Sequence, residues 1–172
     1  MKLRDKQVVA ITGAAGNLGG ILARNMARDE VFLHLLWHNK PIIPSLTERP
    51  NVTAFRVDLA RRETLVGAFD GVDTVVHFAG VLFRGRPEKF LPKTNISYFA
   101  NVLDVAVTAG VRRVVLISFP HVEGETTPEC PATGRFDGNP LSVHAATRLE
   151  EEKLLMSRPG IEKVILRCGM VY

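Results

Sequence analysis

The stretch VVAITGAAGNLGGILARNMAR, residues 8–28, decides the fold of this chain. It begins as an apolar run typical of a buried strand, breaks into glycines, and continues with the apolar spacing of a helix. In such a strand–turn–helix, Gly13 permits the tight turn, Gly16 lets the backbone approach a pyrophosphate, and Gly19 lets helix and strand pack closely. Amide groups at the helix N-terminus then face the phosphates. Glycines also serve ordinary turns, but this context predicts a dinucleotide site.

Strand-like and helical patterns alternate along the whole chain. Runs such as VVLIS and TVVHF are apolar throughout, as strands buried on both faces of a parallel sheet should be. Longer segments with helical spacing separate them, and this order is typical of βαβ units. We therefore expect one domain over residues 1–172, with an α/β, Rossmann-like, doubly wound parallel sheet and the strand order 3-2-1-4-5-6. Strands are predicted at 8–12, 31–37, 52–57, 73–78, 113–118 and 163–167, and helices at 18–28, 61–69, 92–109 and 141–157.

Two predicted loops stand out from this alternation. Residues 84–89 are short and basic, whereas residues 119–140, FPHVEGETTPECPATGRFDGNP, are rich in Pro, Gly, Thr and acidic residues. The second loop is long for a connection inside a compact domain. Loops of that length are usually binding loops, lids or disordered segments.

The composition fits a globular protein of one domain. Of the 172 residues, 46% are hydrophobic, and the net charge of +4 comes from Lys and Arg scattered among 18 acidic residues. Nucleic-acid binding needs clustered basic residues, so none is expected. No apolar stretch approaches the ~20 residues of a membrane helix and no leader peptide is recognisable, so no membrane role is expected. Cys130 and Cys168 lie far from each other and from any histidine cluster, which predicts free thiols, no metal site and a cytoplasmic location.

Three more stretches carry a recognisable pattern. VDLARRETLVGAFDGVDTVVHFAG (57–80) has an Asp-Leu pair near its start and an H-x-A-[AG] motif at its end. KTNISYFANVLDVAVTAGVRRVVLIS (93–118) has an Asn in a long helix, and LRCGMVY (166–172) has Cys168 in the place of a proline. Together with TGxxGxxG they resemble the NAD-dependent epimerase/dehydratase family, the extended branch of the short-chain dehydrogenase/reductase superfamily. The resemblance spans residues 6–172 and implies an NAD(P)-binding domain.

The resemblance also implies roles for individual residues. Asp58 and Leu59 would touch the adenine, although Asp58 could also cap the following helix. His77 is assigned to the geometry of the cofactor loop, and Asn95 to a hydrogen bond with a backbone group across the core. The predicted cofactor-binding residues are Gly13, Ala15, Gly16, Asn17, Leu18, Gly19, His38, Lys40, Asp58, Leu59, Phe78, Ala79, Gly80 and Asn95.

The end of the second strand bears on the choice between NAD and NADP. An acidic residue there would bind the ribose 2′-hydroxyl, and a cation would accept a 2′-phosphate. The sequence has Trp37-His38-Asn39-Lys40 and no acidic residue at this place. His38 and Lys40 therefore favour NADP over NAD, with a merely solvated loop as the alternative.

The catalytic pattern of the family is altered in this chain. Family members use a tyrosine in Y-x-x-x-K as acid and base, a lysine that lowers its pKa, and a Ser or Thr after the fifth strand. In the matching helix, NPLSVHAATRLEEEKLL, His144 stands at the tyrosine position and Arg148 at the lysine position. In ISFPHVEG, Ser118 comes one residue early and Phe119 occupies the Ser/Thr position.

Two interpretations of these changes stay open. In the first, His144 replaces the tyrosine as acid and base, Arg148 binds the ribose hydroxyls, and Ser118 assists. In the second, the helix no longer catalyses, and we favour loss of the ordinary dehydrogenase step because arginine lacks the compact geometry of lysine. The expected function is that of an NAD(P)-binding oxidoreductase or epimerase that acts by hydride exchange on a small hydroxyl- or carbonyl-bearing substrate, such as a sugar nucleotide. The alternatives are a non-catalytic NAD(P) sensor or scaffold, and a fragment with an incomplete site.

Family members continue into a smaller substrate domain, which this sequence would only begin at Tyr172, so we expect the C-terminal substrate lobe to be missing. The helix at 92–109 is apolar on two faces. In the family, the corresponding helices pair between subunits, which implies a homodimer through the helices at 92–109 and 141–157. The alternative is a helix buried entirely within its own monomer.

Overall fold

Six parallel strands form one sheet in the computed structural model, which describes residues 7–80 and 85–169. The strand order is β3-β2-β1-β4-β5-β6, so the predicted Rossmann-like order is confirmed. Each strand lies within one or two residues of its predicted range, because apolar, β-branched runs between turn residues mark buried strands well. The strands are β1 (Val8–Thr12), β2 (Phe32–Trp37), β3 (Val52–Arg56), β4 (Thr74–His77), β5 (Arg113–Ser118) and β6 (Glu162–Arg167).

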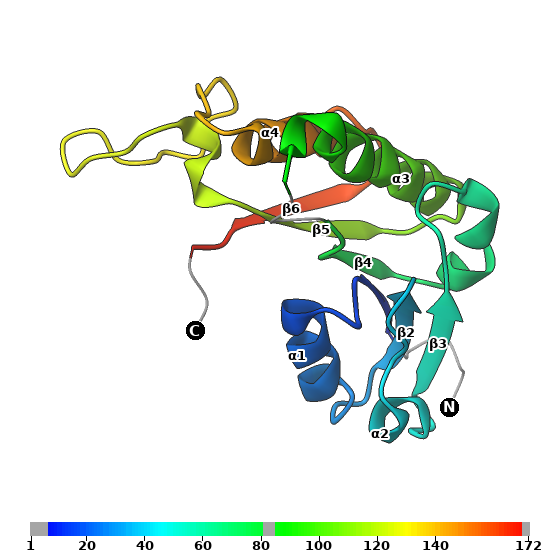
Figure 1. The fold of residues 1–172 in the computed structure, drawn as a ribbon. Coiled ribbons are helices and arrows are strands. Elements are labelled where there is room, and N and C mark those ends of the chain that lie inside the picture. The colour runs from blue at the N-terminus through cyan, green and yellow to red at the C-terminus, as the bar shows by residue number, and fades with distance from the viewer. Residues whose placement is uncertain (1–6, 81–84, 170–172) are drawn as a thin grey trace.

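Helices cover the sheet from two sides (Figure 1). Helix α1 (Asn17–Met26) lies on the opposite side of the sheet from α3 (Tyr98–Thr108) and α4 (Val143–Met156). The two sides correspond to two clusters of buried apolar residues. One cluster includes Phe69, Phe99 and Leu103, and the other includes Ile11, Leu33 and Ala23.

Some helical segments differ from the sequence prediction. The helix predicted at 61–69 is two short 3₁₀ turns, η2 (Arg62–Thr64) and η3 (Gly67–Phe69), because helix propensity is weak over so short a segment and tertiary packing decides its conformation. The first turn and a half of the helix predicted at 92–109 is a π-helix, η5 (Pro92–Ser97). The short helix α2 (Pro44–Thr47) and the 3₁₀ turns η4 (Pro87–Lys89) and η6 (Pro120–Glu123) had no prediction.

Helix α4 starts two residues later than predicted. Ser142 is its N-cap, and the Ser142 hydroxyl accepts a hydrogen bond from the backbone N–H of Ala145 at 3.1 Å. Leu141, which apolar spacing assigned to the helix, is 71% exposed. The capping preference of serine therefore outweighs the apolar pattern at this end.

Most of the apolar surface of α3 is covered within the chain. Phe99, Leu103 and Ala106 on one face, and Val102 and Val105 on the other, are all buried. This burial accounts for the two apolar faces without a second subunit, and the homodimer through these helices stays a prediction. Within residues 7–80 and 85–169, no helix is long and apolar enough to cross a bilayer.

Candidate dinucleotide-binding site

The glycine turn between β1 and α1 is tightly packed. Gly13 has a φ of +71°, which side-chain-bearing residues rarely adopt, and an added Cβ there would lie 2.9 Å from the backbone nitrogen of Ala79. An added Cβ at Gly19 would overlap the carbonyl oxygen of Gly13. Glycine at these two positions therefore lets the turn fold against both the first helix and the end of β4.

The N-terminus of α1 lacks an internal partner for its first amide groups. Its N-cap is Gly16, which offers no side-chain hydrogen bond, and its first turn holds no acidic residue. Unsatisfied N–H groups and the positive end of the helix dipole make such a terminus a place for an anion.

A cavity of about 250 Å³ lies beside this terminus. The glycine turn forms one wall through Ala14, Ala15, Gly16 and Asn17, and the segment after β2 forms another. The two charged residues among those lining the cavity, Arg24 and Lys40, are both cationic. The other lining residues are Gly20, Pro41, Ile42, Ile43 and Leu46. The cavity thus combines amide donors, two cations and an apolar floor, which fits one end of a dinucleotide.

The structure brings some predicted cofactor residues to this cavity and places others elsewhere. Ala15, Gly16, Asn17 and Lys40 line it. Sequence reasoning missed Arg24, although it lies seven residues after the helix begins, on the same helix as the glycines. Predicted residues that are not among its lining are Gly13, Leu18, Gly19, His38, Asp58, Leu59, Phe78, Ala79, Gly80 and Asn95.

Residues after β2 and β3 make local hydrogen bonds. His38 Nδ1 lies 2.8 Å from the carbonyl oxygen of Val57, so this nitrogen donates to the backbone. Asp58 Oδ1 accepts from the backbone N–H of Ala60 at 3.0 Å, which closes a local turn. The N-cap of the following 3₁₀ turn η2 is Arg61, without a side-chain cap hydrogen bond, so the capping role considered for Asp58 is not the one it has. An adenine contact by Asp58 stays a prediction.

A buried histidine ties the ends of β1 and β4 together. His77 Nδ1 lies 2.8 Å from the hydroxyl oxygen of Thr12, and that oxygen accepts from the backbone N–H of Ala79 at 3.3 Å. Burial, helped by the charge of Arg148, lowers the pKa of His77 to about 3. The ring is therefore neutral near pH 7, and its contacts shape the loop that packs on Gly13.

The predicted catalytic position on α4 holds a half-buried histidine. The rings of His144 and Phe119 meet edge to face with centroids 4.9 Å apart. Burial first, and the charge of Arg148 second, lower the pKa of His144. Its buried Nε2 has no hydrogen-bond partner among the described residues. The ring of His144 is therefore neutral near pH 7.

Arg148 is buried between α4 and the end of β4. Its Nη1 donates to Glu151 Oε2 at 2.8 Å, and its Nη2 lies against Gly80. Burial raises the pKa of Glu151 to about 7, although the charge of Arg148 acts in the opposite direction. The structure thus brings Arg148 to the end of β4 with one side of its guanidinium held by Glu151, and the binding of ribose hydroxyls by Arg148 stays a prediction.

Ser118 faces α4 from the last position of β5. Its buried hydroxyl donates to Glu152 Oε1 at 2.5 Å. This donation fixes the hydroxyl hydrogen on a carboxylate, and a catalytic role for Ser118 stays a prediction.

Asn95 is completely buried in the π-helix η5. Its Nδ2 donates to the hydroxyl of Thr147 on α4 at 3.1 Å, so its partner is a side chain and not the backbone group expected. Within residues 7–80 and 85–169, no group of His, Cys, Asp and Glu side chains could hold a metal ion.

Comparisons with known proteins agree with this geometry. The profile of the NAD(P)H-binding family matches residues 13–172. The chain is 28% identical over 165 residues to uronate dehydrogenase from Pseudomonas syringae pv. tomato, covering 94% of this chain and 58% of that protein. It is 29% identical over 176 residues to L-arabinose 1-dehydrogenase (NAD(P)(+)) from Haloferax volcanii, covering 94% and 66%. The chain therefore spans about three fifths of the length of these relatives.

The fold is shared with a solved structure that contains a nicotinamide cofactor. A short-chain dehydrogenase/reductase superfamily protein from Agrobacterium tumefaciens with bound NAD superposes with a TM-score of 0.77 and 27% identity, covering 94% of this chain and 48% of that one. Three findings indicate a dinucleotide-binding domain. The family profile covers most of the chain, the sheet has the Rossmann-like strand order, and the glycine turn leads into an uncapped helix. The chain belongs to the NAD(P)H-binding family, within the short-chain dehydrogenase/reductase superfamily of epimerases, dehydratases and dehydrogenases.

Proposed function

We propose that residues 1–172 form one NAD(P)-binding domain that takes part in hydride exchange on a small hydroxyl- or carbonyl-bearing substrate, such as a sugar nucleotide. The observation that carries this proposal is the uncapped N-terminus of α1, which opens on a 250 Å³ cavity lined by the glycine turn. A bound nicotinamide would supply the hydride donor or acceptor. The relatives named for uronate and arabinose oxidation support a sugar-like substrate.

NADP is the cofactor that the cavity favours. Lys40 follows β2, where the cofactor's ribose 2′-position is recognised, and Arg24 joins it in lining the cavity from α1. Two cations with no acidic residue in the lining suit a 2′-phosphate better than a 2′-hydroxyl. His38, whose Nδ1 donates to Val57, is the weaker candidate for this role.

His144 is the residue best placed for acid–base work. A neutral imidazole can accept a proton, and its buried Nε2 has no hydrogen-bond partner among the described residues. Arg148 supplies positive charge at the end of β4, where it would favour the deprotonated form of a hydroxyl group. This arrangement supports the oxidation of an alcohol, a reaction in which His144 would act first as the base.

Binding titrations with NADPH and NADH test the cofactor. We expect tighter binding of NADPH, and we expect Arg24→Gln and Lys40→Gln each to weaken it about tenfold while NADH affinity changes little, because a charge-assisted hydrogen bond contributes ~1.5–3 kcal/mol. Lys153→Gln is the matched control, since Lys153 pairs with Glu150 on the exposed side of α4. Tighter binding of NADH by the unaltered chain would overturn the NADP preference.

Turnover of sugar nucleotides, uronates and aldoses tests the reaction. His144→Ala should abolish any activity found, since His144 occupies the family's acid–base position and alanine cannot exchange a proton. Unchanged turnover in this variant removes His144 from the mechanism. Tight cofactor binding with no turnover on the panel would favour the non-catalytic sensor or scaffold.

The cellular location is part of the same proposal. Cys130 and Cys168 are both free thiols, as expected for a protein of the cytoplasm. Fractionation of cells that express the tagged chain would test the location directly.

A further inference from the structure

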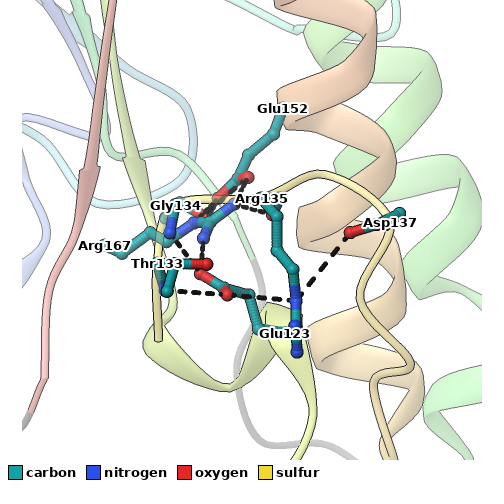
Figure 2. Close-up of polar contacts among 8 residues, drawn as sticks. Glu123, Thr133, Gly134, Arg135, Asp137, Glu152 and Arg167 are labelled. Carbon is teal, nitrogen blue, oxygen red and sulfur yellow. Dashed lines mark hydrogen bonds and ion pairs between the residues drawn. The ribbon is translucent and has the colours of Figure 1, made fainter. Parts of the chain in front are cut away.

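A cluster of buried charges lies where β5 and β6 end, away from the dinucleotide cavity. Figure 2 shows Arg167, the last residue of β6, between the carboxylates of Glu123 and Glu152. Both carboxylate side chains are fully buried, and the Arg167 side chain is 14% exposed. We call these three residues the Arg167 cluster.

Every donor group of Arg167 has a partner in the cluster or in the loop after β5. Its Nε and Nη2 donate to Glu152 at 3.0 and 2.7 Å, and its Nη1 donates to Glu123. Nη2 also donates to the carbonyl oxygen of Arg135 at 2.8 Å, and the guanidinium lies 5.5 Å from the ring centroid of Phe136. One guanidinium therefore joins β6, α4 and the loop at 133–136.

Glu123 fastens the base of the long loop. Its carboxylate accepts from the backbone N–H groups of Thr133 at 3.0 Å and Gly134 at 2.8 Å. Burial alone would raise the pKa of Glu123, but these hydrogen bonds and the charges of Arg167 and Arg135 hold it below its usual value. Glu123 thus favours its ionised form and binds the backbone of the same loop ten residues further on.

The two ends of this loop also touch each other. An added Cβ at Gly124 would lie 2.7 Å from the carbonyl oxygen of Asn139, and one at Gly138 would lie 2.6 Å from that of Val122. At the tip, Thr127 and Cys130 exchange backbone hydrogen bonds of 3.1 Å. Figure 1 shows the tip projecting away from the body of the molecule beyond the end of β5. The two ends of the loop are therefore held together at its base, and backbone hydrogen bonds within the loop close its tip.

Glu152 links the cluster to the proposed substrate side. It accepts from Ser118 at the end of β5, one residue before Phe119, and it lies on α4 two turns after His144. Phe119 and His144 are the pair whose rings meet. The cluster therefore connects the end of β5, next to Phe119, with helix α4, which carries His144, and with the loop. All three meet at the sheet edge where ligands of open α/β folds bind.

We propose that Arg167 is a positioning residue: through Glu152 it sets α4 against β5 and so places His144 against Phe119, and through Glu123 it holds the base of the loop at 124–138 at the end of β5. The effect of this positioning on catalysis rests on the proposed function, whereas the attachment of the loop by Arg167 does not. Lysine cannot reproduce this role, because one ammonium group cannot bind two carboxylates and a carbonyl in the fixed planar geometry of a guanidinium.

Chymotrypsin cleavage after Phe136 reports whether the base of the loop is attached, because this ring lies against Arg167. We expect Glu123→Gln and Arg167→Lys to speed this cleavage at least about tenfold, since cleavage follows the open population. Arg158→Met is the matched control: it removes a pair with Asp104 beyond the far end of α4 and should not speed cleavage at Phe136.

A second readout separates positioning from stability. In Arg167→Lys, the imidazole NMR signals of His144 should shift; these signals are assigned by their loss in His144→Ala. In Arg158→Met they should stay unchanged, even if this control loses as much melting temperature as Arg167→Lys does. If Arg167→Lys does not fold, Glu123→Gln alone decides through cleavage.

Wild-type cleavage rates in both cluster variants, or rates that rise only as far as the melting temperature predicts, would overturn the proposal. Absence of NADPH binding by the unaltered chain would instead contradict the proposed function, and the cleavage result would still stand.

Discussion

The guanidinium of Arg148 lies directly against the Cα of Gly80, so that a methyl group on residue 80 would overlap Nη2. A residue on α4 reaches the end of β4 because residue 80 has no side chain. Arg148 is held there from its other side by Glu151 at 2.8 Å. This contact is the structural link between the helix with the altered catalytic positions and the strand end that belongs to the cofactor motif.

Gly80→Ala should therefore displace Arg148 and separate it from Glu151. We expect a loss of about 1–3 kcal/mol in the free energy of unfolding, as for other overpacked sites, measured by urea denaturation. Gly67→Ala is the control, because an added Cβ there would meet nothing within 4 Å and should cost little. Equal stability of the two variants would show that Arg148 does not depend on Gly80.

Ser118→Ala should lower stability without changing chemistry. The hydroxyl donates to a buried carboxylate, and such a bond contributes about 1.5–3 kcal/mol. Ser157→Ala, which removes an exposed hydroxyl bonded to the carbonyl of Leu154, should cost less. A fall in turnover, at unchanged cofactor affinity and with the fold intact, would support the predicted catalytic role of Ser118.

Glu151 should make stability fall as pH rises. Burial raises its pKa from the usual 4.5 to about 7, so the folded state favours the protonated form. The stability it contributes is fully present below pH 4.5 and is lost as pH rises through 7, amounting to about 3 kcal/mol.

Glu151→Gln imitates the neutral form and isolates this effect. The stability of the variant relative to the unaltered chain should rise between pH 5 and pH 8, by up to about 3 kcal/mol in urea denaturation. His77, which titrates in the opposite sense, is present in both proteins and cancels in the difference. Glu150→Gln, on an exposed pair with Lys153, should show a much smaller trend. A difference that falls with pH would mean that Glu151 is most stabilising as the ionised partner of Arg148.

The sequence was sufficient for the sheet but less so for its helical connections. Local apolar runs define β1 to β6, and the glycine turn at residue 13 fixes where the first helix begins. Residues 61–69 look helical in pattern, yet they form two 3₁₀ turns whose Ala68 and Phe69 are buried in the core. There, tertiary packing decides between two conformations that differ little in intrinsic propensity.

The cofactor turn followed from spacing alone, because three glycines with one strand and one helix are local information. Arg24 escaped notice because its place in the cavity depends on how α1 faces the segment after β2. The Arg167 cluster could not be predicted either, since Glu123 and Arg167 are 44 residues apart and their partnership exists only in the folded sheet. Charged residues in a loop and at a strand end are ordinarily solvated.

Calorimetric titration of the purified chain with NADPH tests the central claim most directly. A diphosphate held by the amides of α1 predicts saturable heat of binding, together with an affinity at least about tenfold lower in Gly19→Ala, whose added methyl group would collide with the carbonyl oxygen of Gly13. Circular dichroism should show both proteins folded. A folded chain that gives no heat with NADPH or NADH would contradict the account.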